Sequence, residues 1–188
     1  MLTGKIFQKG DTLIEVLFAV TVFSLVAVGA LSIMNSSTAV AERALETTLV
    51  RNQIDAQAEV LRYIHDSYIA TYPNPVSGQP SAEWSNKIIT NEVTNATTFG
   101  TCTPPTNAFV VNTDTDKVES RSAIVTDVQT YAQLRLTTTP ISSEGLWVEA
   151  IKSNATNKYI DFHIRACWYS QGLDVPMTLG TIVRLYEP

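Results

Sequence analysis

The chain has 188 residues, of which 45% are hydrophobic, and a formal net charge of −5 at pH 7. This length predicts one globular domain with an extension. The acidic balance argues against broad nonspecific binding to nucleic acid or to anionic membrane surfaces. The histidines are His65 and His163, and the sequence offers no Ser-His-Asp arrangement, glycine-rich phosphate loop or zinc cluster. We therefore expect a protein that is not an enzyme and that needs no metal or other cofactor.

An uncharged, mostly apolar run extends from Val16 to Met34. As a helix it would be about 28 Å long, which is close to the hydrocarbon thickness of a bilayer. Glu15 stands directly before this run, where a carboxylate is costly unless it finds a partner. Lys5 and Lys9 precede it, so the positive-inside rule keeps the short leader cytoplasmic and exports the C-terminal part. The run thus predicts one membrane-spanning helix.

Two interpretations of this stretch involve the membrane but no association with other subunits. A secretory signal peptide could be cleaved at the A-x-A-like residues 39–41, before Glu42. However, the apolar run exceeds the usual length of about 7–15 residues, and Asp11 and Glu15 are acidic where the leading region should be basic. A plain membrane anchor would use Thr12 as the N-cap of the helix, with Glu15 completing a capping box.

A third interpretation treats the stretch as a signal for processing and assembly. Gly10 is followed by Asp11-Thr12-Leu13-Ile14-Glu15-Val16, and this segment resembles the N-terminal motif of type IV prepilins and related pseudopilins. The resemblance implies that a prepilin peptidase cuts between Gly10 and Asp11 and usually methylates the new amine on Asp11. It also implies that Glu15 assists the docking of a new subunit on its neighbour. Asp11 stands where the family most often has phenylalanine, so methylation is less firmly implied than cleavage.

Elementary electrostatics agrees with this interpretation. Cleavage would leave a cationic α-amine on Asp11, and in a stack of parallel helices the Glu15 carboxylate of one subunit could meet the amine of the next. Such pairing is favourable mainly because an unpaired charge in lipid is so costly. Small or hydroxyl-bearing residues in the run would let the helices approach closely. These are Ala19, Ser24, Ala27, Gly29, Ala30 and Ser32.

The helix is expected to continue past the membrane, from about Thr12 to about Ala70, because no proline interrupts this stretch. Its second half carries an apolar stripe with spacings of three or four residues, which needs a cover from the C-terminal half of the chain. The stripe comprises Val50, Ile54, Ala58, Leu61, Ile64 and Tyr68, widened by Leu45 and Leu49. Three prolines within residues 73–80 end the helix.

The C-terminal half predicts several short strands. Residues 84–89 fit a short helix or a strand, and strands are expected near residues 108–112, 146–151, 158–169 and 177–186, with residues 124–125 and 134–136 undecided. In residues 158–169 the even positions from Ile160 to Trp168 alternate with polar residues and would pack on the helix. Glu149 and Asp161 are expected to face solvent as ordinary strand carboxylates.

Cys102 and Cys167 both lie in the exported part of the chain. An even pair in an oxidising compartment favours one disulfide, worth about 4 kcal/mol in the chain-entropy model. Two buried free thiols are the alternative.

We therefore predict an α+β fold in which the long N-terminal helix packs against a C-terminal antiparallel β-sheet head, as the resemblance to pilins implies. The expected parts are a leader (residues 1–10), a transmembrane or filament-core half of the helix (11–35), an amphipathic half (36–72) and a β-rich head (73–188). The predicted function is that of a type IV pilus subunit, with a minor pilin favoured over a major one, which moves from the membrane into an extracellular filament. Its partners would be prepilin peptidase, other pilin subunits and the inner-membrane assembly platform. The alternatives are a secretion-system pseudopilin and a membrane-anchored extracellular binding module.

Overall fold

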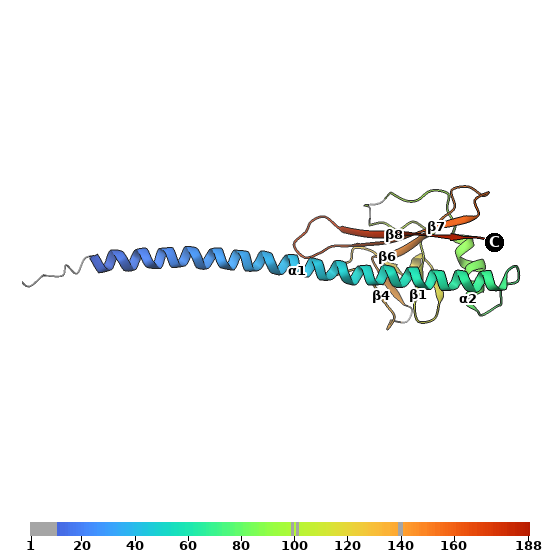
Figure 1. Cartoon of the computed structure of the whole chain (residues 1–188), viewed down its shortest axis with the longest axis horizontal. Coiled ribbons are helices and arrows are strands. Elements are labelled where there is room, and N and C mark those ends of the chain that lie inside the picture. The colour runs from blue at the N-terminus through green and yellow to red at the C-terminus, as the bar shows by residue number, and fades with distance from the viewer. Residues whose placement is uncertain (1–10, 99, 101, 139–140) are drawn as a thin grey trace, which may run out of the picture. The chain divides into compact units, whose positions relative to one another are not determined.

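The computed structural model describes residues 11–98, 100, 102–138 and 141–188, with the side chains of Asp11 and Thr12 left out (Figure 1). Its elements are α1 (Asp11–Thr71), α2 (Pro80–Glu83), a π-helical turn η1 (Trp84–Ile88), 3-10 turns η2 (Ile89–Asn91) and η3 (Arg121–Ala123), and strands β1 (Val110–Asn112), β2 (Lys117–Glu119), β3 (Ile124–Val125), β4 (Gln133–Arg135), β5 (Ser142–Glu144), β6 (Leu146–Ile151), β7 (Tyr159–Trp168) and β8 (Met177–Tyr186). The α+β class is confirmed, because one long N-terminal helix precedes a C-terminal antiparallel sheet.

The chain divides into two compact units, Met1–Glu42 and Arg43–Pro188. The leader predicted for residues 1–10 lies outside the described residues. Within the first unit the structure describes the beginning of α1, and within the second it describes the rest of α1 together with all the strands. Helix α1 begins at Asp11 and ends at Thr71, one residue beyond the predicted limits at either end.

The second part of α1 buries the predicted stripe. Residues 50, 54, 58, 61, 64 and 68 are all buried, and they belong to one cluster with the inner side chains of the strands. Leu45 was predicted to widen the stripe, which is wrong, because its side chain is 60% exposed. It stands five residues before Val50, which at about 100° per residue turns it about 140° away from the stripe. Glu46 takes the covered position instead, and its carboxylate accepts a hydrogen bond from Trp168 Nε1 at 3.1 Å.

The main sheet has the order β6-β7-β8 and is antiparallel throughout. The alternation predicted along β7 is confirmed. Its even-numbered residues from Ile160 to Trp168 lie in the core cluster, whereas Cys167 belongs to a second, smaller cluster with Trp147. Strand β6 is buried along its whole length, so it has no solvent-facing row. The odd-numbered residues of β7 and the even-numbered residues of β8 share the other side of the sheet, which we call the outer face.

The remaining strands form two small sheets, one of β1 and β2 and one with the order β3-β5-β4. The sequence suggested an antiparallel head, but strands β3 and β5 are parallel, so the head is not antiparallel throughout. Gly145 joins β5 to β6 with φ +65°, and a Cβ there would lie 2.1 Å from the carbonyl oxygen of Cys167. Only glycine fits this close approach.

Residues 84–89 adopt the helical alternative, in which Trp84 and Ile88 are fully buried in the core. The Trp84 ring packs against Phe162 of β7, with ring centroids 5.4 Å apart. This segment therefore closes the core beside the end of α1.

Candidate functional site

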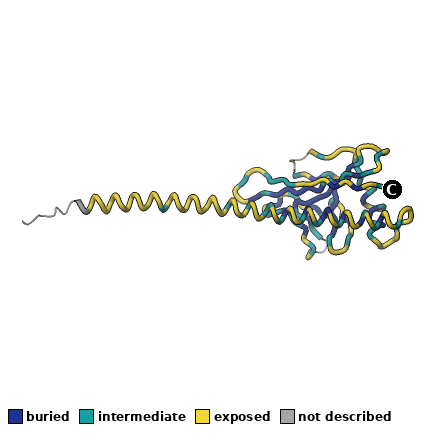
Figure 2. Tube along the Cα trace, in the orientation of Figure 1, coloured by how far each residue is buried: buried dark blue, intermediate teal, exposed yellow. Residues whose placement is uncertain are grey.

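The first part of α1 is an apolar surface. Every large hydrophobic residue from Leu13 to Met34 is exposed, and Figure 2 shows this stretch in the colour of exposed residues along almost its whole length. The helix is long and apolar enough to cross a membrane by length and composition. The predicted transmembrane helix therefore has the required physical character.

The hydroxyl groups within this stretch do not make it polar. Thr21 Oγ1 donates a hydrogen bond to the carbonyl of Phe18 at 2.8 Å, and Ser24 Oγ donates to that of Val20 at 2.7 Å. Both hydroxyl protons are thus satisfied by the helix itself, which is what a helix in lipid or between other helices requires.

The predicted processing and docking residues lie at the beginning of this surface. Gly10 lies outside the described residues, and Asp11 is the first residue of α1. Glu15 is exposed, one turn after Asp11, so the two positions share a face of the helix. Over the described part of the chain, no ion pair reaches Glu15. The capping box between Thr12 and Glu15 stays a prediction.

The head carries a disulfide between Cys102 and Cys167, which are 65 residues apart in the sequence. Cys167 stands on the outer face of β7 next to Gly145, to whose carbonyl it donates its backbone N–H at 2.7 Å. The bond fastens the segment around Cys102 to the main sheet.

Glu149 is the residue whose environment the sequence predicted wrongly. Instead of facing solvent it is 1% exposed. Its carboxylate accepts hydrogen bonds from Thr97 Oγ1 at 2.6 Å, from the Thr97 backbone N–H at 3.1 Å and from Trp147 Nε1 at 2.9 Å. Arg165 Nε lies 3.4 Å away and balances its charge. Because residues near Thr97 cover this side of β6, a carboxylate there is buried and needs these partners.

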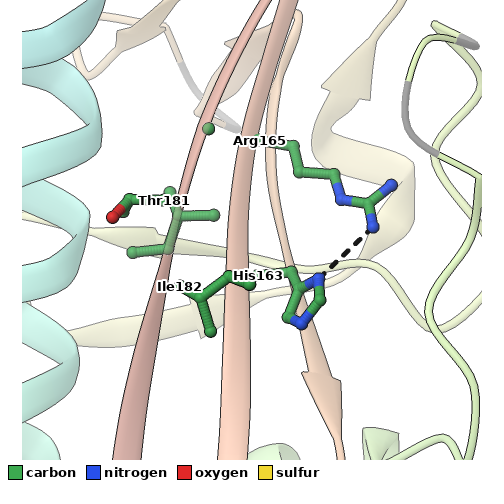
Figure 3. A pocket seen from close by; sticks show the side chains of 6 residues that line it. His163, Arg165, Thr181 and Ile182 are labelled. Atoms are coloured by element: carbon green, nitrogen blue, oxygen red, sulfur yellow. Dashed lines mark hydrogen bonds between the residues drawn. The ribbon is translucent and has the colours of Figure 1, made fainter.

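A hollow of about 290 Å³ lies beside this polar cluster on the outer face (Figure 3). Its lining comprises His163, Ile164, Arg165, Gly180, Thr181 and Ile182. The Arg165 guanidinium lies 3.4 Å from His163 Nδ1, as the dashed line in Figure 3 marks. Partial burial, together with the charge of Arg165, lowers the pKa of His163. The imidazole is therefore neutral near neutral pH and adds no charge to the hollow.

The other histidine, His65, is engaged within the head. His65 Nε2 lies 2.8 Å from the carbonyl oxygen of Tyr186, and its ring contacts Trp84. Among the residues that the structure describes, no group of three or more His, Cys, Asp or Glu side chains could hold a metal ion.

A basic patch for nucleic acid would have to form around cations of the head such as Arg121, Arg135 and Lys152. Each is engaged within the head. Arg121 donates to the carbonyls of Pro104 and Ile124, Arg135 pairs with Glu144, and Lys152 pairs with Glu187.

Comparison with known proteins finds no matching family model, no matching curated protein and no matching solved structure.

Proposed function

We propose that this chain is a type IV pilus subunit, most simply a minor pilin, that waits in the membrane as a precursor and is then drawn into an extracellular filament. A prepilin peptidase cuts between Gly10 and Asp11. The apolar first part of α1 then exchanges lipid for the same part of neighbouring subunits, and the head lies on the filament surface.

The observation that carries this proposal is the combination of Gly10 and Glu15 with the exposed surface that follows them. Large apolar side chains cover the helix from Leu13 to Met34 on all sides, and within residues 13–34 the sequence has one carboxylate, Glu15. A simple anchor needs the apolar surface, but it has no use for a carboxylate at its edge beyond capping the helix. An assembling helix does gain, because the new amine on Asp11 of a neighbouring subunit supplies the missing cation.

The fold is compatible with this use. The second part of α1 buries its stripe under the strands, so the head keeps its own core while the first part is free to change its surroundings. A secretion-system pseudopilin would have the same build, and the cell that makes the protein separates these two functions. A membrane-anchored binding module is the alternative of another class, favoured by the hollow on the outer face.

Replacement of Glu15 tests the proposal. In cells that make filaments, Glu15→Leu should leave the protein in the membrane fraction but deplete it from sheared filaments by about tenfold or more, since about 1.4 kcal/mol changes an equilibrium tenfold. Glu42→Leu is the matched control, because it removes an exposed carboxylate from the same helix outside the apolar run. Normal incorporation of Glu15→Leu would overturn the proposal, as would equal depletion of both variants.

A further inference from the structure

Strand β8 is the edge of the main sheet, and much of it is uncovered. It pairs with β7 along its whole length, and its other side has no neighbouring strand among the described elements. Thr178 and Leu179 are half-buried, whereas Gly180, Thr181 and Ile182 are exposed. Ile182 is 61% exposed and stands beside the hollow on the outer face.

The pairing register decides which backbone groups of β8 face away from the sheet. The Glu187 N–H donates to the carbonyl of Lys158, so this pair exchanges hydrogen bonds, and bonding alternates along the antiparallel ladder from there. The odd-numbered residues of β8 therefore bond to β7. The N–H and C=O groups of Thr178, Gly180, Ile182 and Arg184 point outward, and within the described part of the chain no hydrogen bond reaches them.

This row of free groups has defined ends. Pro176 has no N–H at the next outward position before Thr178, so a ladder cannot continue there. At the other end, the outward carbonyl of Tyr186 is already bonded to His65 of α1. The free edge is therefore the stretch from Thr178 to Arg184.

Exposed edge strands are usually protected by charges, by bulges or by a covering segment. Here residues 175–183 carry no charge, although the whole chain has a net charge of −5. The β7–β8 ladder runs from Met177 to Tyr186 without a bulge. The edge thus keeps the features that favour the addition of a strand.

We propose that β8 binds an extended segment of another protein, which adds a strand to the sheet along Thr178–Arg184 and places one apolar side chain in the hollow. Outward N–H and C=O groups at alternate residues match the backbone of a strand and of no other common ligand. Because the edge carries no charge from Thr178 to Val183, a charge on the facing part of the bound segment would lose water there without gaining a partner. A bound residue that pairs with Gly180 has its side chain on the same face, where Gly180 lines the hollow together with His163 and Ile182.

A second copy of this chain fits the edge less well. Glu46 contacts Trp168, whose partner in the ladder is Met177, and His65 contacts Tyr186, so β8 runs in the same direction as residues 46–65 of α1. Antiparallel pairing of two β8 edges would make these two helices antiparallel. Copies whose residues 46–65 lie parallel therefore cannot pair their β8 edges in this way. Apart from this comparison with a second copy, the inference goes beyond the proposed function and does not depend on it.

The test measures amide hydrogen exchange by NMR on the full chain in detergent micelles. The probe is a short synthetic peptide of alternating valine and threonine, and its control is the same peptide with every backbone nitrogen methylated, so that neither edge of the control can pair with β8. In the free protein the amides of Thr178, Gly180 and Ile182 should exchange faster than those of Leu179, Thr181 and Val183. Bound peptide should slow the first group by about tenfold or more, because each amide gains a ladder hydrogen bond. The methylated peptide should leave them unchanged.

Two variants separate the edge from the rest of the surface. Ile182→Lys puts a charge at the hollow and should weaken peptide binding about tenfold. Val175→Lys is the matched control, since Val175 is 71% exposed but lies before Pro176 and outside the free edge, and it should bind as the natural chain does. Equal slowing by both peptides, no slowing at all, or equal weakening by both variants would overturn the proposal. Protection of the edge that rises with protein concentration in the absence of peptide would also overturn it, in favour of pairing between copies.

Discussion

Two stretches of one helix, Leu13–Met34 and Val50–Tyr68, treat their apolar side chains in opposite ways. In the first, apolar residues surround the helix and remain exposed, and in the second they form a single stripe that the strands cover. The same kinds of side chain thus contact an apolar surrounding in the first stretch and form the hydrophobic core of the head in the second. The distribution around the helix, rather than the amount of apolar surface, separates the two uses.

Polar side chains sharpen the contrast. In the first stretch, Thr21 and Ser24 bond to carbonyls of their own helix and offer nothing outward. In the second, Gln57 lies fully buried within the stripe and reaches across to β1. Its Nε2 donates to the carbonyl of Val111 at 2.7 Å, and its Oε1 accepts from the N–H of Val111 at 2.9 Å. One amide therefore pairs with a strand backbone as another strand would.

Truncation of one leucine in each stretch should give the largest difference. Leu61 is fully buried, so Leu61→Ala should lower the free energy of unfolding of the head by about 2–5 kcal/mol through lost burial and a cavity. Leu25 is 75% exposed, so Leu25→Ala should change it by less than about 0.5 kcal/mol. Denaturant unfolding of the full chain in detergent micelles measures both. Similar losses in the two variants would mean that the first stretch also belongs to the folded core.

Loss of the Gln57 amide should have a somewhat smaller effect. Gln57→Leu keeps the side chain roughly the same size but leaves the N–H and C=O of Val111 unpaired. The cost should be about 2 kcal/mol, the lower end of about 1–3 kcal/mol for each of the two groups, because the leucine adds buried apolar surface. Asn52→Leu, at an exposed position of the same helix, is the control and should be nearly neutral. A Gln57→Leu protein as stable as the natural one would show that the bond to β1 is dispensable.

Acidification should have the weakest effect, through His163 in the head. Burial, with the charge of Arg165, lowers the pKa of His163 in the folded protein, while Glu149 and Asp161 oppose this change. The unfolded chain therefore takes up this proton at a higher pH than the folded one, and the free energy of unfolding should fall as the pH drops below about 6.5. His163→Gln should flatten that slope between neutral pH and pH about 5. Parallel stability curves for the two proteins would contradict this role of His163.

The spacing of apolar residues was sufficient to predict a core face where a single covering layer decides which residues are buried. The spacing of residues 50–68 and the alternation of residues 158–169 predicted the core faces, because each pattern needs only one covering layer. Glu149 was assigned to solvent, since no pattern in the sequence reveals that residues near Thr97 fold over β6. The role of Gln57 could not be predicted, because its partner Val111 lies 54 positions away in the sequence. Leu45 was wrongly assigned to the apolar stripe of α1. One turn before Val50 the covered position belongs to Glu46, and the stripe does not continue through Leu45.

The free edge of β8 was missed for a related reason. The sequence predicted the strand, but whether a strand lies inside a sheet or at its edge depends on the topology, which spacing does not encode. The uncharged run of residues 175–183 was the signal that pointed to it, and it became informative once the order β6-β7-β8 was known.

The central claim is that the exposed first part of α1 is a processed segment that leaves the membrane for a filament. Mass spectrometry of the protein recovered from cells tests it most directly, by locating the N-terminus of the mature chain. The account predicts that the chain begins at Asp11, with or without a methyl group on its amine. A chain that still begins at Met1, or that begins at Glu42, would contradict it.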